Sequence, residues 1–246
     1  STVEERSLVK LNVESDVATI VLNRPDVRNA LNRQLMIDLI DVAQSVSDRE
    51  DIRVVLLTSE GQDFSVGADL KEVAGMDPSG SLLRARRDAE LGRKLLTTIK
   101  SIHQPTICAV KGVATGGGAC LAAACDFRIA SQSARIGLGE VKVGMNLMWN
   151  AVPLFVELLG LSRAKRLIMS GDLLGSETLE QWGLLDEICP DTELANVAVQ
   201  WARQYADLPP VAVQMIKRSV NQYALALSEA VMHMDEDQWI LAARSD

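Results

Sequence analysis

The sequence predicts an α/β fold in which a parallel sheet is followed by a helical tail. Two apolar runs, "RVVLLTS" (53–59) and "TICAVKG" (106–112), have the length and composition of buried strands. They alternate with long segments whose apolar residues recur every three or four positions, as in amphipathic helices. After Trp149 the strand signal nearly vanishes. Alternating strands and helices are typical of α/β layers with parallel strands.

The first half of the chain gives these elements in order. Alternating polarity in "LVKLNVESDVATIVLNRP" (8–25) indicates two strands joined near Ser15 and closed by Pro25. Helices are expected over 30–48, over 81–102 before Pro105, and directly after the glycine run 116–118. Further strands are expected over 126–131 and 134–138. The stretch "AGMDPSGS" (74–81) is interpreted as a mobile surface loop.

The second half is predicted to be almost entirely helical. We expect six helices, over 151–160, 162–171, 176–183, 193–208, 210–225 and 226–245, with one short strand within 184–189. We divide the chain into a core, residues 1–190, that carries the site and a C-terminal helical region, residues 191–246. That region is expected to cover the site or to form an oligomer interface.

Composition excludes several function classes. The chain has 246 residues, of which 48% are hydrophobic, and a formal net charge of −8. A nucleic-acid partner is disfavoured because such proteins carry a basic face. No apolar stretch approaches the roughly 20 residues that span a bilayer, and "STVEERSLVK" lacks the apolar region of a signal peptide, so no membrane partner is expected.

The four cysteines show no CxxC spacing and there are only two histidines, so no metal site is expected. This cysteine usage favours a reducing compartment. We expect a cytoplasmic protein, with the mature mitochondrial matrix as the alternative.

Two glycine-containing turns follow predicted strands: "DFSVGADLKEV" (63–73) and the start of "KGVATGGGACLAAACDFRIAS" (111–131). A glycine turn that feeds a helix exposes backbone N–H groups at the positive end of the helix dipole. Such a turn can bind a phosphate or a developing oxyanion. The alternative is that the glycines only allow the helix to pack closely on the sheet. Neither a P-loop nor a GxGxxG motif is present.

Several motifs occur together in order: "RPDVRNAL" (24–31), "FSVGADLKEV" (64–73), the glycine segment, "IGLGEVKVG" (136–144), "LLGLSRAKRLIMSGDLLGSETLEQWGLLDEI" (158–188) and "PPVAVQMIKRSV" (209–220). Over essentially its whole length the chain resembles the crotonase superfamily, that is, the enoyl-CoA hydratases and isomerases. The resemblance implies the crotonase fold, a spiral of ββα repeats followed by a helical trimerisation region. It also implies an acyl-CoA substrate, no cofactor beyond the coenzyme A of that substrate, and a homotrimer or homohexamer.

The resemblance assigns roles to individual residues. The backbone N–H groups of Ala68 and Gly117 are expected to polarise the thioester carbonyl and to stabilise the resulting enolate. Glu140, in a sequence rich in apolar residues, is expected to be the catalytic base, with a pKa raised by its apolar surroundings. From local sequence alone it is equally a surface glutamate.

Hydratases of the family carry a second glutamate, where this chain has Cys120. Cys120 is either a small core residue or a thiol whose pKa is lowered near a helix start. A single glutamate resembles the Δ3-Δ2-enoyl-CoA isomerases, which we therefore favour. The alternatives are an enoyl-CoA hydratase, another reaction of the family such as decarboxylation, dehalogenation or hydrolysis, and a catalytically inactive CoA-binding scaffold.

A second departure follows Glu140, where the family pattern is rich in glycine and proline and this chain reads "GMNLMWNAVP" (144–153). Large side chains here indicate a filled acyl pocket that favours short or unusual acyl groups, or else only altered packing. The expected pocket residues are Gly116, Cys120, Met145, Asn146, Met148 and Trp149. His233, between two methionines, is interpreted as a packing or subunit-contact residue.

Coenzyme A itself is expected along the two loops that precede the glycine run. By resemblance its binding residues are Val27, Arg28, Ala30, Ser65, Val66, Ala68, Leu70 and Lys71. Arg28 and Lys71 would attract the nucleotide phosphates, or they are ordinary solvated surface cations.

Overall fold

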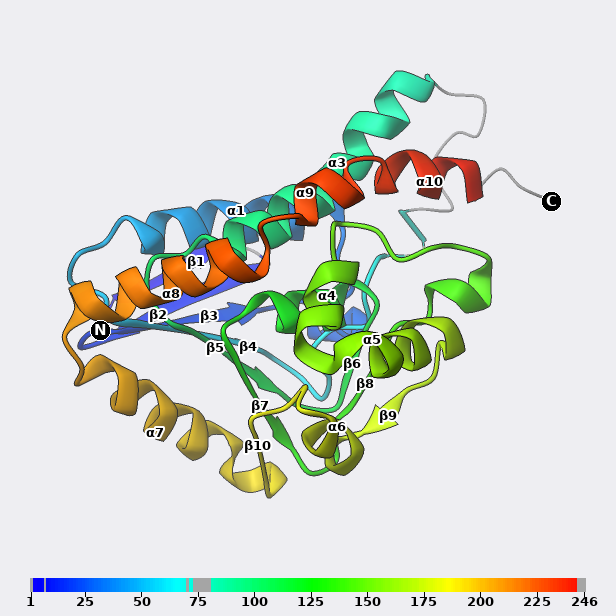
Figure 1. The fold of residues 1–246 in the computed structure, drawn as a ribbon. Helices are drawn as coiled ribbons and strands as arrows, with labels where there is room; N and C mark the ends of the chain where they lie inside the picture. The colour runs from blue at the N-terminus through cyan, green and yellow to red at the C-terminus, as the bar shows by residue number, and fades with distance from the viewer. Residues whose placement is uncertain (1, 7, 70, 73–80, 243–246) are drawn as a thin grey trace.

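A seven-stranded mixed sheet forms the centre of the computed structural model, which describes residues 2–6, 8–69, 71–72 and 81–242 (Figure 1). The strand order is β1-β2-β3-β4-β5-β7-β10. The strands are β1 (Thr2–Arg6), β2 (Val9–Glu14), β3 (Val17–Leu22), β4 (Val54–Ser59), β5 (Thr106–Val110), β7 (Phe127–Ser131) and β10 (Glu187–Cys189). The first three pair antiparallel, and β3 through β10 pair parallel.

A second, three-stranded sheet carries the turns that form the site. It consists of β6 (Val113–Thr115), β8 (Arg135–Gly137) and β9 (Leu174–Gly175), in the order β6-β8-β9. Three short 3-10 helices connect larger elements: η1 (Pro25–Val27) follows β3, η2 (Glu140–Val143) follows β8, and η3 (Asp191–Glu193) follows β10.

Helices cover both faces of the large sheet. They are α1 (Arg33–Ser47), α3 (Leu82–Lys100), α4 (Gly117–Ala124), α5 (Val152–Ser170), α6 (Ser176–Trp182), α7 (Leu194–Ala206), α8 (Pro210–Ala224), α9 (Ser228–Met232) and α10 (Asp235–Ala242). In β4, Val55 and Leu57 join the cluster under α1 and α3, whereas Val54 and Leu56 join the cluster under α7. Burial on both faces explains why this strand is apolar at nearly every position.

The predicted α/β class with parallel strands is confirmed, and so are the hairpin of β2 and β3 and the helices α1, α3 and α4. The two helices expected over 151–171 are confirmed: the segment labelled α5 consists of two helices that meet at the non-helical Gly160, with a φ of +73°. One tail prediction was wrong in detail, since the last expected helix is divided into α9 and α10. The strands β1, β6 and β9 were not predicted, because β1 is charged and the other two are very short.

The C-terminal helices take different positions. Helix α7 packs on the sheet through Leu194, Ala198, Ala202 and Ala206, whereas α8 has no buried residue. Helix α10 packs on α3 (Figure 1). The predicted boundary after residue 190 lies between β10 and η3, and its status as a domain boundary stays a prediction. The expected mobile loop lies outside the described residues except for Ser81. Within the described ranges, no helix is long and apolar enough to cross a bilayer.

Candidate active site

The two glycine turns of the sequence meet in space. Gly67 has a positive φ of 82°, and a Cβ built on it would lie 2.7 Å from the Thr115 carbonyl oxygen and 3.1 Å from the Gly117 nitrogen. Backbone pairing fixes this approach, since the Ser65 N–H donates to Val113 at 3.1 Å and the Thr115 N–H donates to Ser65 at 3.0 Å. A side chain at position 67 would therefore drive the turns apart.

Ala68 and Gly117 stand side by side as a result, and both line the same pocket. The backbone of Leu31 fixes the residues on either side of Ala68. The Leu31 N–H donates to the Gly67 carbonyl at 2.7 Å, and the Leu31 carbonyl accepts from the Asp69 N–H at 3.1 Å. Within the described part of the chain, no hydrogen bond satisfies the N–H of Ala68 or that of Gly117. Gly117 is also the first residue of α4, where N–H groups have no helical acceptor. The arrangement offers two N–H donors to a ligand.

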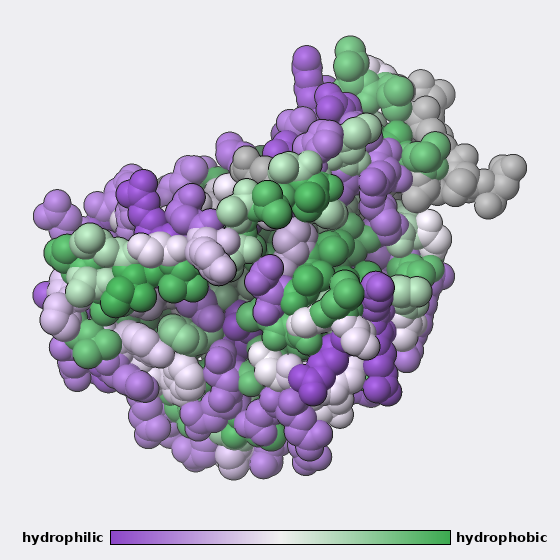
Figure 2. Space-filling model, viewed as in Figure 1, coloured by the Kyte–Doolittle hydropathy of each residue, from purple (hydrophilic) through white to green (hydrophobic). Residues whose placement is uncertain are grey.

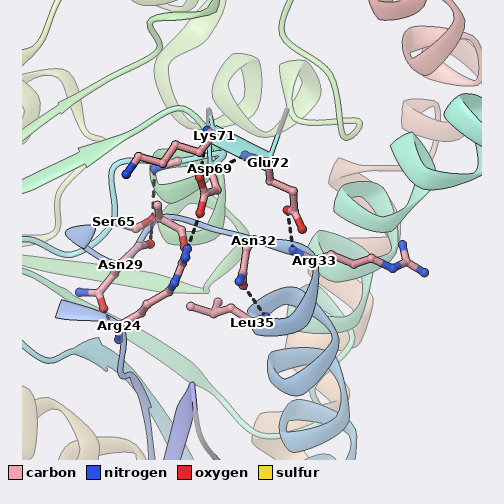
Figure 3. Close-up of polar contacts among 11 residues, drawn as sticks. Arg24, Asn29, Asn32, Arg33, Leu35, Ser65, Asp69, Lys71 and Glu72 are labelled. Carbon is pink, nitrogen blue, oxygen red and sulfur yellow. Dashed lines mark hydrogen bonds and ion pairs between the residues drawn. The ribbon is translucent and has the colours of Figure 1, made fainter. Parts of the chain in front are cut away.

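Side chains brace the turn that carries Ala68 (Figure 3). Arg24 contacts the Asp69 carboxylate at 2.6 Å and the Ala30 carbonyl at 3.0 Å, and this contact lowers the pKa of Asp69. The Ser65 hydroxyl donates to the Asn29 carbonyl at 2.8 Å and accepts from the Gly67 N–H at 3.2 Å. Because these bonds join loops on both sides, the position of Ala68 is set by the scaffold.

A pocket of about 140 Å³ opens in front of the two N–H groups. Most of its lining is apolar, which is typical of small-molecule sites. The lining residues are Leu31, Met36, Ala68, Glu72, Ala85, Asp88, Ala89, Gly92, Gly117, Cys120, Glu140, Met145, Asn146, Leu147, Met148 and Trp149.

Glu140 lies at the start of η2, over the glycine turn. A Cβ built on Gly116, whose φ is +54°, would lie 3.1 Å from the Glu140 Oε1 atom. The Oε2 atom is buried and has no hydrogen-bond partner. Burial raises the pKa of Glu140, which is the expected direction for a carboxylate in an apolar site. An unpaired, desolvated carboxylate of this kind is suited to accept a proton.

The other two carboxylates of the pocket are occupied. Glu72 accepts from the Arg33 N–H at 2.9 Å, and Asp88 contacts the Arg33 guanidinium at 3.3 Å. Asp88 also lies 3.6 Å from Arg84. Of the carboxylates that line the described pocket, Glu140 is therefore the one with no ion pair and with a buried oxygen, Oε2, that has no hydrogen-bond partner.

Cys120 lies one turn into α4 and is buried at the pocket wall. Its pKa is raised well above the usual thiol value, first by burial and then by the charges of Glu140 and Asp235. The interpretation that the helix start lowers the pKa of this thiol is wrong, because loss of solvation on burial is the largest effect on this pKa and raises it. The thiol stays protonated at neutral pH.

The Trp149 ring forms part of the pocket wall. A Cβ on Gly92 of α3 would come within 1.9 Å of its ring, and a Cβ on Gly117 would come within 2.5 Å. The ring thus fills space that two glycines leave open on two different helices. The absence of a side chain at Gly117 therefore makes room for the Trp149 ring, and not only for a substrate. The structure places Met145, Asn146 and Met148 on the same wall.

The two loops expected to bind coenzyme A lie next to each other, because the Val66 N–H of one loop donates to the Arg28 carbonyl of the other at 3.1 Å. Val27, Arg28 and Lys71 are exposed, Val66 is half-buried, and Ala30 and Ser65 are buried. The Arg28 guanidinium donates to Asp63 at 2.6 Å, so part of its charge is already neutralised. Leu70 lies outside the described residues. The binding role of this group stays a prediction.

Sequence reasoning missed several residues of the pocket, including Leu31, Gly92 and Asp88. Leu31 ends the motif 24–31, where it was not singled out. No local motif marks Gly92 and Asp88, because only the tertiary fold brings α3 to the glycine turn. Throughout the described ranges, no group of three or more His, Cys, Asp or Glu side chains is arranged to hold a metal ion.

Comparison with known proteins identifies the family of the chain. The family model described as enoyl-CoA hydratase/isomerase matches residues 12–240. The chain belongs to the enoyl-CoA hydratase/isomerase family. It is therefore a member of the crotonase superfamily, and the expected enzyme class, an enoyl-CoA hydratase/isomerase-type acyl-CoA enzyme, is confirmed at that level.

Curated relatives carry both activities in their names. The chain is 32% identical over 219 residues to the short-chain-enoyl-CoA hydratase of Clostridium acetobutylicum, covering 89% of this chain and 82% of that protein. It is also 32% identical over 235 residues to the 1,2-epoxyphenylacetyl-CoA isomerase of Escherichia coli, covering 95% and 89%. These names alone do not choose between hydration and isomerisation.

Solved structures agree with the fold of this family member. The enoyl-CoA hydratase of Bacillus anthracis superposes with a TM-score of 0.83 at 29% identity, covering 93% of this chain and 90% of the other. The enoyl-CoA hydratase of Bacillus halodurans, at 22% identity, superposes with a TM-score of 0.90 and covers 97% and 96%. The predicted crotonase fold is confirmed.

Proposed function

We propose that the chain is a Δ3-Δ2-enoyl-CoA isomerase that uses Glu140 as its single proton carrier. The observation that carries this proposal is the state of the pocket carboxylates. Glu140 is buried with an unpaired oxygen, whereas Glu72 and Asp88 are tied to Arg33. The position where hydratases of the family carry a second glutamate holds the protonated thiol of Cys120.

In the proposed reaction the thioester carbonyl of a 3-enoyl-CoA accepts hydrogen bonds from the N–H groups of Ala68 and Gly117. Glu140 then removes a proton from C2, and the electron pair moves into an enolate conjugated with the C3–C4 double bond. The two donors stabilise the oxyanion. Return of the same proton to C4 gives the 2-enoyl-CoA. Nothing is added or released, so the reaction needs no metal and no cofactor besides the coenzyme A of the substrate.

Hydration of a 2-enoyl-CoA is the second candidate, supported by the hydratase names of many relatives. Addition of water across the double bond requires a group that orients and activates the water and a group that protonates C2. A single carboxylate beside a protonated thiol supplies these functions poorly. We therefore place isomerisation first.

The size of the pocket supports short or compact acyl groups. Its volume of about 140 Å³ is well below the roughly 300–1,000 Å³ of most ligand pockets. The Trp149 ring closes the space between α3 and α4, where a longer chain would otherwise extend. Altered packing without a specificity role is the alternative.

The C-terminal helices support association of the chain into a trimer or hexamer. Apolar side chains that recur mostly every three or four residues stay exposed along α8 and beyond, and Figure 2 shows hydrophobic residues gathered over this region. They are Val211, Met215, Ile216, Val220, Tyr223, Leu227 and Val231. Light scattering of the purified protein measures the assembly, and a monomeric mass would contradict this part of the proposal. A cytoplasmic location is also proposed, supported by four free cysteines, all buried.

The experiment that tests the function is a coupled absorbance assay with trans-3-hexenoyl-CoA and, separately, with crotonyl-CoA. Conversion of the first with little hydration of the second supports the isomerase. Efficient hydration of crotonyl-CoA would overturn it in favour of the hydratase. If neither substrate is turned over but acyl-CoA still binds, the chain is a CoA-binding scaffold or acts on a different acyl group.

A further inference from the structure

The ring of Trp149 is held by a backbone that few residues adopt. Trp149 and the following Asn150 have φ values of +69° and +55°, two consecutive non-glycine residues in the left-handed region. Such conformations persist only where the surrounding structure enforces them, and they concentrate at functional sites. Both residues are buried.

The group that enforces this turn comes from the other end of the chain. The Asn150 N–H donates to Asp235 Oδ2 at 2.7 Å, a buried hydrogen bond across 85 positions of sequence. Asp235 is the first residue of α10 and is 1% exposed. Its second oxygen, Oδ1, is buried without a partner. A buried carboxylate with one hydrogen bond is a poor choice for stability alone, which points to a positioning role.

The first helical turn of α10 connects the Trp149–Asn150 segment to α3. Gln238, three residues after Asp235, accepts from the Asn146 side chain at 3.3 Å. Between them, Glu236 contacts Arg93 of α3 at 2.6 Å, and Arg93 directly follows Gly92, the residue that leaves room for the Trp149 ring. Residues 235–238 therefore connect the loop that carries Trp149 to the helix that receives it.

We propose that Asp235 is a positioning residue that sets the acyl-chain specificity of the pocket by holding the Trp149–Asn150 turn. Trp149 then forms a fixed end wall rather than a movable side chain. This inference deepens the proposed function and rests on it for the identity of the ligand as an acyl-CoA. Asp235 does not line the pocket, and it acts through the backbone of Asn150. The raised pKa of Asp235, about 6, fits a carboxylate that is kept buried next to Glu236.

The test measures binding of saturated acyl-CoAs, butanoyl-CoA and decanoyl-CoA, by calorimetry, since these ligands cannot isomerise. The wild type should prefer the short ligand. Asp235→Leu, which keeps the branching of the side chain but has no acceptor, should reduce this preference about tenfold or more, chiefly by improving the affinity for decanoyl-CoA. Asp235→Asn retains an acceptor for the Asn150 N–H and should restore the preference.

The matched control is Asp237→Ala, which removes an ion pair between α10 and Arg86 but no contact to the Trp149 loop. It should leave the ratio of the two dissociation constants unchanged. If Asp235→Leu does not fold, Asp235→Glu displaces the carboxylate by one methylene and should shift the ratio in the same direction. An unchanged ratio in the folded Leu or Glu variant would overturn the proposal.

Failure of the proposed function gives a different result. Wild-type protein that binds neither acyl-CoA would refute the function itself. Wild-type protein that binds both ligands equally well would refute the fixed wall while leaving the function intact.

Discussion

The two sides of the pocket are built in opposite ways. On one side, the turn of Ala68 is braced by several hydrogen bonds from Arg24, Ser65 and Leu31, which join it to a loop up to 45 positions away. On the other side, the loop of Trp149 adopts two left-handed residues and depends on α10, more than 80 positions away. The side that we propose binds the thioester is held by many contacts, whereas the side that we propose faces the acyl chain is held by few. We therefore expect that substrate preference can change without disturbing the chemistry at the thioester.

The largest expected effect comes from Glu140→Gln, which removes the proposed proton carrier and keeps its shape. We expect kcat for isomerisation to fall by about 10²–10⁴-fold, with little change in the binding of substrate analogues. Burial raises the pKa of Glu140, so the wild-type rate should fall as pH drops through a value above the usual glutamate range of about 4.3.

Stability should move in the opposite direction to activity. A folded-state pKa above the unfolded value means that the stability contributed by the protonated form is present at low pH and lost as pH rises through the folded pKa. Glu140→Gln should therefore have a higher Tm than the wild type at pH 8, measured by calorimetry. A variant that is both less active and less stable would argue for a merely structural Glu140.

The second-largest effect is expected from Gly117→Ala, because Gly117 contacts the Trp149 ring and so joins the two sides of the pocket. The new Cβ would lie 2.5 Å from the Trp149 ring and should displace either the ring or the N–H donor. Loss of one such donor typically lowers kcat by about 10²–10³-fold. Steady-state kinetics of Gly117→Ala with and without Trp149→Ala separates the two causes. Recovery in the double variant assigns the loss to the ring, and no recovery assigns it to the donor.

The sequence allowed one side of this comparison to be predicted far better than the other. Ala68, Gly117 and Glu140 lie in short motifs whose local backbone defines their positions, so resemblance placed them around one pocket. The pocket contribution of Gly92 and the contact of Asp235 had no local signal. A glycine within α3 and an acidic residue at the start of α10 acquire meaning only through contacts distant in sequence. The β6 and β9 strands were missed for a similar reason, since isolated segments of two or three residues have no reliable pattern.

A smaller effect is expected at Gly92, which contacts the ring but neither N–H donor. Gly92→Ala should destabilise the protein by about 1–3 kcal/mol, because a Cβ would overlap the Trp149 ring. In a Trp149→Ala background the same change should stabilise α3 by about 0.5–1 kcal/mol, since alanine is the better helix former. Urea unfolding of the four proteins closes the double-mutant cycle. Equal effects in both backgrounds would show that the ring does not occupy this space in solution.

The smallest effect concerns the carboxylate that holds the Trp149 loop. Asp235 has a pKa of about 6, raised by burial and by Glu236, against about 3.9 in an unfolded chain. Its contribution to stability is complete below the unfolded value and is lost as pH rises through about 6. Asp235→Asn, which stays neutral and keeps an acceptor, should match the wild-type Tm only below the unfolded pKa of about 3.9 and exceed it by a few degrees at pH 8. A Tm difference that does not change with pH would mean that Asp235 is not desolvated, and that α10 does not close over this loop in solution.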